Sequence, residues 1–221
     1  PFVFVRFVVF ILLALVAGVS ARPVAGASGN RSFVVEEATI AQVHEAFRSG
    51  AITCRELVET YLARIDRYDN QGPALNAIAS LNPHARAEAD RLDAEFKIVG
   101  LTGPLHCVPV ILKDNIETAG WETTAGSLAL KGFVPANDAT VVRRLKRAGA
   151  LMLAKGNMSD LALNALTTVN RLEGTTRNPY ALDRVAAGSS GGTSVAIAAN
   201  FGLVGLGTDT GNSVRGPAAH T

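Results

Sequence analysis

Three short apolar runs, separated by segments with helical patterns, constrain the fold of this chain more than any other feature. The runs are residues 108–112 (VPVIL), 151–154 (LMLA) and 204–206 (VGL), and each has a length typical of a buried strand. Residues 138–148 and 193–199 lie between them and have helical patterns. This alternation predicts an α/β fold with a mixed or largely parallel central sheet covered by helices. In the first of these helices we expect three apolar side chains to face inward, Val141, Val142 and Leu145.

The N-terminal third of the folded region predicts helices. Thr39-x-x-Gln42 and Thr53-x-x-Glu56 are capping boxes, and each precedes apolar residues at helical spacing. Asn82-Pro83 supplies an N-cap and a proline for the first turn of a further helix. We therefore predict three helices between residues 39 and 97.

The first 21 residues have the pattern of a secretory signal peptide. Arg6 precedes an apolar run at 7–19, which is shorter than the roughly 20 residues that a membrane span needs. We expect a signal peptide at 1–21, a linker at 22–34 and a folded domain over 35–221. Secretion or a periplasmic location would follow, with no stable membrane span after cleavage. The alternative is a membrane anchor formed by an uncleaved N-terminal segment.

Both ends of the sequence suggest a fragment. The chain begins with Pro1 and stops directly after a glycine-rich segment. An α/β domain normally continues with helices that cover its sheet. We therefore expect the domain to be incomplete at its C-terminal end.

The composition predicts a globular protein and excludes some classes of function. Apolar residues make up 48% of the chain and charged residues 18%, which is enough for a sizeable core. The formal net charge of +2 is too weak to indicate a nucleic-acid partner, and the sequence has no cluster of Lys and Arg with interleaved aromatic residues. Cys54 and Cys107 match no metal-binding spacing. In an exported protein they could form one disulfide, and two buried thiols are the alternative.

A glycine- and serine-rich region at residues 188–219 holds the densest candidate chemistry. Its two loops, 188–192 (GSSGG) and 207–219 (GTDTGNSVRGPAA), flank the helix expected at 193–199. Backbone N–H groups in such loops can converge on an oxyanion or a phosphate. Neither loop has the P-loop pattern, and Gly205-Leu206-Gly207 lacks the third glycine of a dinucleotide fingerprint. A G-x-S-x-G pattern fits around Ser190, but a nucleophile elbow needs a preceding strand, and residues 180–187 predict a turn.

A nucleophilic serine in these loops needs a general base. The four histidines give no Ser/His/Asp arrangement. We expect His44 and His84 on the surface, His106 could line a pocket, and His220 lies at the end of the chain. Lys113 is the better candidate, because it ends an apolar strand and a lysine in an apolar site has a lowered pKa.

Several of these segments resemble the amidase-signature family, and they occur in the family's order. Residues 209–215 (DTGNSVR) resemble the family signature, and 106–115 (HCVPVILKDN) resemble its lysine strand. Residues 154–159 (AKGNMS) and 176–180 (TRNPY) resemble two further family segments. The resemblance covers about residues 35–221. It implies the family's α/β fold, with a mixed central sheet covered by helices and truncated at the C-terminus.

The resemblance also implies a Ser-Ser-Lys triad. Ser213 would be the nucleophile, and Ser189 would be a bridging serine held by a cis peptide bond. Lys113 would be the base that deprotonates Ser213 through Ser189. Four backbone N–H groups would form the oxyanion hole, those of Thr210, Gly211, Asn212 and Ser213.

Three further residues would support this site. Ser190 would hydrogen-bond Lys113, and Asp209 would pair with Arg215 to shape the loop. Asn212 and Cys107 stand where many family members have glycine. If position 212 needs a positive φ, asparagine is the best choice other than glycine.

The implied activity is hydrolysis of a carboxylic amide C–N bond through a serine acyl-enzyme, with no metal or cofactor. The substrate would be a small-molecule or peptide amide, no nucleic-acid partner is implied, and the oligomeric state stays open. One alternative is a glutamine-hydrolysing amidotransferase subunit, against which the signal-peptide pattern argues. The others are an esterase and an inactive, non-enzymatic fragment.

Overall fold

The computed structural model describes residues 33–221. The expected signal peptide and most of the linker at 22–34 lie outside the described residues. The described part begins with the helices α1 (Ile40–Arg48), α2 (Cys54–Ile65) and α3 (Ala85–Val99), so the three predicted helices are confirmed. Both predicted capping boxes are present. The third helix has His84 as its N-cap, slightly later than predicted, and the Asn82 side chain accepts a hydrogen bond from the His84 N–H at 2.9 Å.

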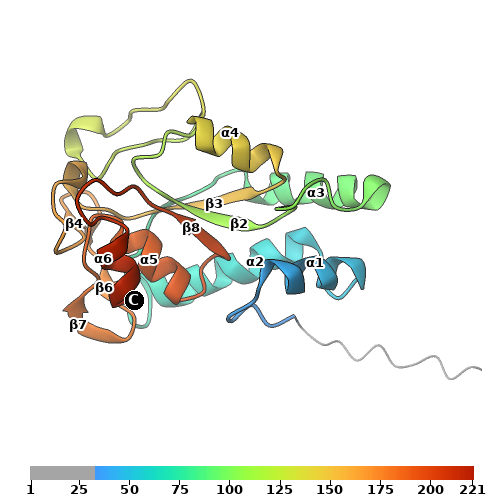
Figure 1. Ribbon diagram of the computed structural model, residues 1–221, viewed down its shortest axis with the longest axis horizontal. Helices are drawn as coiled ribbons and strands as arrows, with labels where there is room; N and C mark the ends of the chain where they lie inside the picture. The colour runs from blue at the N-terminus through green and yellow to red at the C-terminus, as the bar shows by residue number, and fades with distance from the viewer. Residues whose placement is uncertain (1–32) are drawn as a thin grey trace, which may run out of the picture. The chain divides into compact units, whose positions relative to one another are not determined.

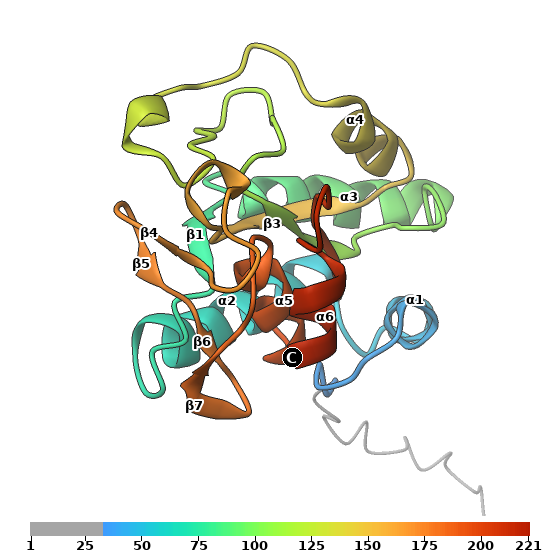
Figure 2. The ribbon, with the colours of Figure 1, turned by 60° about the vertical axis from the view of Figure 1, so that its left-hand side comes forward.

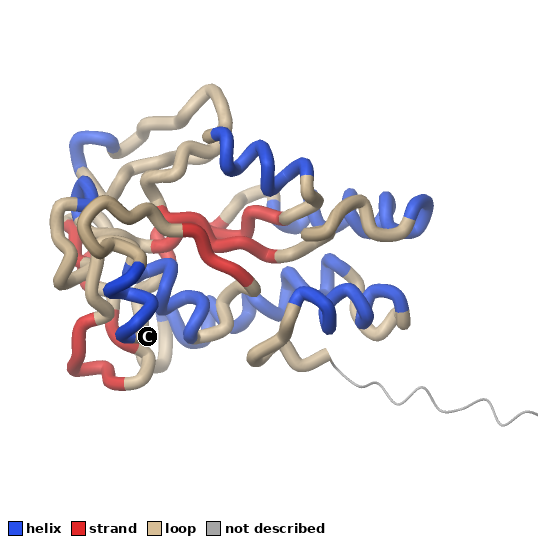
Figure 3. The backbone as a smooth tube through the Cα atoms, viewed as in Figure 1, coloured by secondary structure: helices blue, strands red, loops and turns tan. Residues whose placement is uncertain are grey.

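A four-stranded sheet lies between the helices (Figure 3). Its strand order is β1-β3-β2-β8. Its strands are β1 (Ile78–Leu81), β2 (Pro109–Lys113), β3 (Leu151–Gly156) and β8 (Val204–Leu206). Strand β2 pairs in parallel with β3 and β8, and β1 pairs antiparallel with β3. The mixed sheet and its three predicted strands are therefore confirmed. Strand β1 was not predicted, because it has four residues and only Ile78 is buried.

Helices cover both faces of this sheet (Figure 1). Helices α1, α2, α3 and α5 (Gly191–Ala198) contribute to a hydrophobic cluster that includes Ile111 of β2. Helix α4 (Thr140–Arg147) contributes to a second cluster that includes Val110 and Leu112. The two clusters form because successive side chains of a strand point to opposite faces.

The inward face of α4 differs from the prediction at one position. Val142 is fully buried, and Leu145 packs against the second cluster. Val141, however, is 37% exposed, so its predicted inward orientation is wrong. Successive helical residues are about 100° apart around the axis, so Val141 and Val142 do not share one face.

Short elements complete the described unit. Strand β4 (Val169–Asn170) pairs with β5 (Gly174–Thr175), and β6 (Arg177–Asn178) pairs with β7 (Ala181–Val185). Helix α6 (Arg215–His220) follows β8. Three single-turn helices are also present: a π-helix at Asp66–Asn70 and 3₁₀-helices at Leu128–Leu130 and Asp160–Ala162.

The turn predicted at residues 180–187 is wrong over most of its length, because β7 is a strand. Strand β7 is largely exposed and belongs to the β6–β7 hairpin, which lies outside the central sheet (Figure 2). A nucleophile elbow requires a strand of the main sheet before the serine. The G-x-S-x-G pattern around Ser190 is therefore not such an elbow.

Cys54 and Cys107 form a disulfide, with their Cα atoms 5.8 Å apart. This answers the question that the sequence left open. The bond joins the first residue of α2 to the segment that leads into β2. A carboxylate also anchors this end of α2, because Asp93 accepts hydrogen bonds from the N–H groups of Cys54 at 2.7 Å and Arg55 at 2.9 Å.

Removing the disulfide should lower the free energy of unfolding by about 4 kcal/mol, because the bond closes a long loop in the unfolded chain. The two cysteines are 53 residues apart in sequence. Denaturant unfolding of a Cys54→Ala/Cys107→Ala variant would measure the effect. The control is wild-type protein with and without a reductant, and an unchanged unfolding midpoint after full reduction would contradict the expectation.

Candidate active site

The side chain of Lys113 lies at the centre of the candidate site. It is the last residue of β2 and is fully buried. Its Nζ donates hydrogen bonds to Ser189 Oγ at 2.7 Å, to Thr208 Oγ1 at 3.0 Å and to the Thr208 carbonyl oxygen at 3.2 Å. Burial lowers the pKa of Lys113 from 10.5 to about 8, although the charge of Asp209 acts in the opposite direction. A substantial fraction of Lys113 is therefore neutral near pH 8, as a general base must be.

This lowered pKa predicts how any chemistry at the site depends on pH. If neutral Lys113 activates a serine, the rate of serine labelling by a fluorophosphonate should rise with pH through about 8 and level off above it. The direction follows because only the deprotonated amine can accept a proton. Labelling rates measured between about pH 6 and pH 10 would test this. A flat profile over that range would contradict it.

The backbone holds Ser189 in a loop that precedes α5. The Gly188–Ser189 peptide bond is cis, as the family resemblance implied. The Ser189 carbonyl oxygen accepts a hydrogen bond from the N–H of Ser159 at 3.2 Å, and the Gly188 N–H donates to the carbonyl of Ala165 at 3.0 Å. A Cβ atom at position 188 would overlap the carbonyl oxygen of Thr167. Glycine therefore allows this close approach of two backbone segments.

In the described residues Ser190 makes no hydrogen bond to Lys113, which corrects one prediction. Its hydroxyl donates to the Thr208 carbonyl oxygen at 3.3 Å, the same atom that Lys113 Nζ contacts. Ser190 thus helps to fix Thr208 rather than the lysine.

Thr208 and Asn115 belong to this site but were missed by sequence reasoning. The Thr208 hydroxyl accepts hydrogen bonds from Lys113 Nζ and from Asn115 Nδ2, each at 3.0 Å. Both residues adjoin predicted motif residues, since Asn115 is two positions after Lys113 and Thr208 directly precedes Asp209. This closeness in sequence was the one available sign that the two residues belong to the site, and it does not indicate what either side chain does there.

The Asp209 carboxylate organises the second serine loop. It accepts hydrogen bonds from the backbone N–H groups of Asn212 at 2.8 Å, Val214 at 3.0 Å and Arg215 at 3.2 Å. The Arg215 guanidinium adds a pair of bonds, from Nε at 3.0 Å and Nη2 at 3.3 Å. The hydrogen bond from Arg215 and the backbone donors hold the pKa of Asp209 well below its usual range. The predicted pairing of Asp209 with Arg215 is present in the structure.

Three of the four N–H groups predicted for an oxyanion hole have no hydrogen-bond partner in the described part of the chain. Within residues 33–221, no hydrogen bond occupies the N–H groups of Thr210, Gly211 or Ser213. The Asn212 N–H is occupied in this structure, because it donates to Asp209. Asn212 has a φ of 105°, so the condition under which asparagine is the best choice other than glycine is met at this position.

Ser213 lies at the turn that leads into α6, and its side chain is mostly buried. Its carbonyl oxygen accepts a hydrogen bond from the Ser190 N–H at 3.1 Å, so the two serine loops are joined directly through their backbones. Among the described residues, however, no hydrogen bond links the hydroxyls of Ser189 and Ser213. The structure therefore brings Lys113, Ser189 and the Ser213 backbone together, and leaves the two hydroxyls unjoined.

A second buried lysine lies on the neighbouring strand. Lys155 of β3 is fully buried, and burial lowers its pKa to about 8 as well. It pairs with Leu112 in the parallel register and therefore points to the opposite face from Lys113. There its Nζ lies 3.7 Å from an Asp114 carboxylate oxygen, donates to Thr123 Oγ1 and lies 5.4 Å from the ring centroid of Trp121. Lys155 is thus a paired structural cation rather than a base for the serine loops.

The buried histidines lie away from the serines. The prediction of a solvated His44 is wrong, because His44 is buried and its Nε2 lies 3.1 Å from the His106 carbonyl oxygen. The His106 ring packs against Phe47 and Phe96, and its Nδ1 lies 2.9 Å from Thr102 Oγ1. These contacts form where α1 and α3 meet the segment before β2. His84 and His220 are exposed, as expected for His84.

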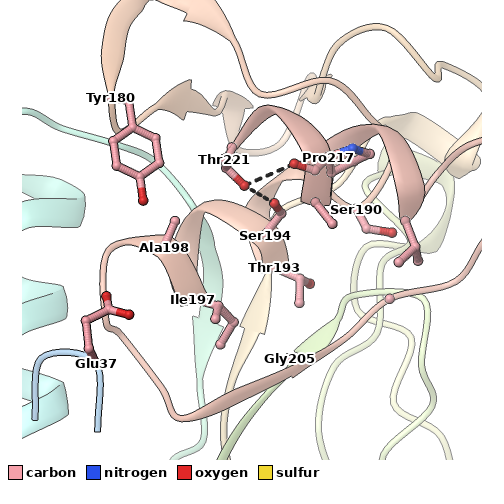
Figure 4. A pocket seen from close by; sticks show the side chains of 13 residues that line it. Glu37, Tyr180, Ser190, Thr193, Ser194, Ile197, Ala198, Gly205, Pro217 and Thr221 are labelled. Atoms are coloured by element: carbon pink, nitrogen blue, oxygen red, sulfur yellow. Dashed lines mark hydrogen bonds between the residues drawn. The ribbon is translucent and has the colours of Figure 1, made fainter.

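A cavity of about 400 Å³ lies beside the site, between α5, α6 and β8 (Figure 4). Ser190 lies at its edge, and α5 contributes Thr193, Ser194 and Ile197 to its wall. Neither Lys113 nor the serines 189 and 213 line it. The cavity is therefore next to the serine loops without containing the candidate catalytic groups.

Residues 33–221 lack two features that would point to other functions. No group of three or more His, Cys, Asp or Glu side chains is arranged to hold a metal ion. In the same part of the chain, no helix has both the length and the apolar character needed to cross a membrane.

The fold and site together define a class of protein. It is an α/β protein in which a buried strand-end lysine meets two glycine-rich serine loops, one of them with free N–H groups beside a buried serine. Such an arrangement suits a serine hydrolase that uses lysine in place of histidine.

The sequence model of the Amidase family matches residues 56–221. A glutamyl-tRNA(Gln) amidotransferase subunit from Halorhodospira halophila is 43% identical over 186 residues. Native peptide amidase from Stenotrophomonas maltophilia is 43% identical and superposes with a TM-score of 0.80 over 83% of this chain. An amidase family protein from Bacillus anthracis is 35% identical, with a TM-score of 0.79 over 84% of this chain. This chain therefore belongs to the amidase-signature family.

The match covers a limited part of each relative. The Halorhodospira protein aligns with 84% of this chain, which corresponds to 37% of the relative's own length. The chain likewise covers 38% of the Stenotrophomonas and Bacillus proteins.

Proposed function

We propose that this protein is an amidase that hydrolyses a carboxylic amide C–N bond through a serine acyl-enzyme. The observation that carries the proposal is the 2.7 Å hydrogen bond between Lys113 Nζ and Ser189 Oγ, made by a buried lysine with a pKa of about 8. Ser213 is the first choice for the nucleophile. Its loop is joined to the loop of Ser189 by the hydrogen bond from the Ser190 N–H to the Ser213 carbonyl oxygen.

In the proposed mechanism Ser213 Oγ attacks the carbonyl carbon of the amide. Its proton passes to Ser189 Oγ while the Ser189 proton passes to neutral Lys113. This relay requires the two hydroxyls to come within hydrogen-bond reach when substrate binds, and catalytic contacts often tighten at that stage. The N–H groups of Thr210, Gly211 and Ser213 would stabilise the oxyanion. Lys113 then returns a proton to the leaving amine, and water hydrolyses the acyl-enzyme.

Covalent labelling tests this proposal directly. A fluorophosphonate should add one label per chain, and peptide mass spectrometry should place it on Ser213. The matched control is Ser213→Ala, which should not be labelled. Absence of labelling in folded wild-type protein would favour the alternative of an inactive, non-enzymatic fragment.

The substrate class needs a second test, because an amidotransferase subunit and a peptide amidase are both 43% identical to this chain. A glutamine-hydrolysing amidotransferase subunit would release ammonia from free glutamine. An amidase for peptide or small-molecule amides would release ammonia from those amides and leave glutamine intact. An esterase would instead turn over only the matching esters. We propose the amidase, because the disulfide suits an exported protein better than one acting on tRNA in the cytosol.

We also propose that the protein is secreted or periplasmic. The signal-peptide pattern at 1–21 and the buried Cys54–Cys107 disulfide support this location. N-terminal sequencing of protein recovered from the producing cells would test it. A mature N-terminus near residue 22 supports export and cleavage, and an intact N-terminus in a membrane fraction supports the uncleaved anchor.

A further inference from the structure

One segment, residues 159–168, makes several of the hydrogen bonds that hold the loop carrying Ser189. Ser159 donates its N–H to the Ser189 carbonyl, and Ala165 accepts the N–H of Gly188. The Ser159 hydroxyl in turn donates to the carbonyl oxygens of Asn164 at 2.9 Å and Thr167 at 2.6 Å. The segment is thus bonded both to itself and to the loop, and it contributes to the position of Ser189.

Thr168 bonds the loop on both sides of Ser189 with a single hydroxyl group. Its Oγ1 donates to the Ala187 carbonyl oxygen at 2.9 Å and accepts from the Gly191 N–H at 3.0 Å. Thr168 is 1% exposed, so its hydroxyl makes these bonds in a buried environment. A Cβ atom at position 191 would overlap Thr168 Oγ1, which shows how closely the two segments pack.

These contacts bracket the lysine–serine pair. Ala187 lies two residues before Ser189, and Gly191 lies two residues after it. Loss of the hydroxyl would leave a buried carbonyl and a buried N–H without partners, and each unpaired group drives the backbone to rearrange. A shift of the loop would displace Ser189 Oγ from Lys113 Nζ, where the present separation is 2.7 Å.

We propose that Thr168 is a positioning residue for Ser189, and that its hydroxyl fixes both flanks of the loop so that Ser189 Oγ stays on Lys113. This inference rests on the proposed function of Ser189 as the bridging serine. Within residues 33–221 Thr168 makes no hydrogen bond to Lys113 or Ser213, so it would act through the backbone of the loop.

The test uses the isosteric Thr168→Val variant and the kinetics of fluorophosphonate labelling. The maximal labelling rate, kinact, should fall by about 10- to 100-fold, because small displacements of a reacting group have effects of this size. The apparent binding constant of the probe, KI, should stay near the wild-type value, because Thr168 is buried away from the probe. Thr168→Ser retains the hydroxyl and should restore kinact to nearly the wild-type value.

Thr176→Val is the matched control. Thr176 is also 1% exposed, and its hydroxyl donates to the Asn76 carbonyl oxygen at 2.7 Å, outside the Ser189 loop. This variant should lose similar stability and keep its kinact. Equal losses of kinact in both valine variants, or a wild-type kinact in Thr168→Val, would overturn the proposal. If Thr168→Val does not fold, Thr168→Ser decides, and a loss of kinact of about tenfold or more there would overturn it.

Amide hydrogen exchange separates this inference from the proposed function. If wild-type protein is not labelled at all, the proposed function fails, and exchange at Gly191 still reports on the loop. Thr168→Val should speed exchange of the Gly191 N–H, and Thr176→Val should not. Unchanged protection of Gly191 in Thr168→Val would show that the hydroxyl does not hold the loop.

Discussion

Replacing Lys113 with methionine should reduce fluorophosphonate labelling of Ser213 by at least about 10³-fold, because the variant retains the apolar stem and loses the base. Lys113 Nζ is the donor to Ser189 Oγ, and no other lysine or histidine in the described residues contacts that hydroxyl. The loss should persist at every pH, whereas wild-type labelling rises through about pH 8. Labelling rates from intact-protein mass spectrometry would measure it.

Lys155→Met is the control for this experiment. Lys155 is as fully buried as Lys113 and has its pKa lowered to a similar value, but it contacts Asp114 and Thr123 on the other face of the sheet. Loss of this lysine leaves a buried carboxylate unpaired, with an expected stability cost of about 3–5 kcal/mol. Labelling of the folded fraction should remain near wild type. Similar losses of labelling in both variants would mean that the Lys113 effect comes from folding and not from base catalysis.

Replacing Asp209 with asparagine should reduce the labelling rate by about 10²-fold, an effect typical of disturbing an oxyanion site. The carboxylate holds the N–H groups of Asn212, Val214 and Arg215 together. An amide side chain has one oxygen to accept these bonds, so the loop should lose the shape that leaves the Thr210, Gly211 and Ser213 N–H groups free. Labelling kinetics together with thermal melting would separate this effect from unfolding.

Asp183→Asn gives a matched comparison. Asp183 also lies near an arginine, with 3.8 Å between its carboxylate and Arg184 Nε, but both side chains are highly exposed on the β6–β7 hairpin. Its substitution should change neither labelling nor the melting temperature. A wild-type labelling rate in Asp209→Asn would show that the carboxylate is not needed to shape the serine loop.

The two lysines show where sequence reasoning reaches its limit. Both end or nearly end a short apolar strand, and both lie within segments that resemble family motifs. The resemblance assigned the base to Lys113. Spacing alone would not have shown which of the two lysines is the base, because that depends on the face of the sheet from which each side chain projects. The strand register decides this, since Lys155 pairs with Leu112 rather than with Lys113.

The sequence by itself determined the features that depend on local interactions. Capping boxes specify helix starts through bonds between residues three positions apart, and apolar runs specify buried strands, so α1, α2 and the strands β2, β3 and β8 were predictable. The sequence also indicated that position 212 tolerates a positive φ, because asparagine adopts a positive φ more readily than other residues except glycine. The family motifs identified the lysine and the serine loops.

Only the tertiary structure decided the features that depend on contacts between distant segments. Strand β1 is stabilised by pairing with β3 across more than 70 residues, and its own sequence carries little apolar pattern. Three other features likewise depend on which residues pack side by side. They are the burial of His44, the disulfide between Cys54 and Cys107, and the hydrogen bond from the Ser190 hydroxyl to the Thr208 carbonyl oxygen. Thr168 is the clearest case, because a lone threonine in a polar loop acquires importance only when folding places its hydroxyl between Ala187 and Gly191.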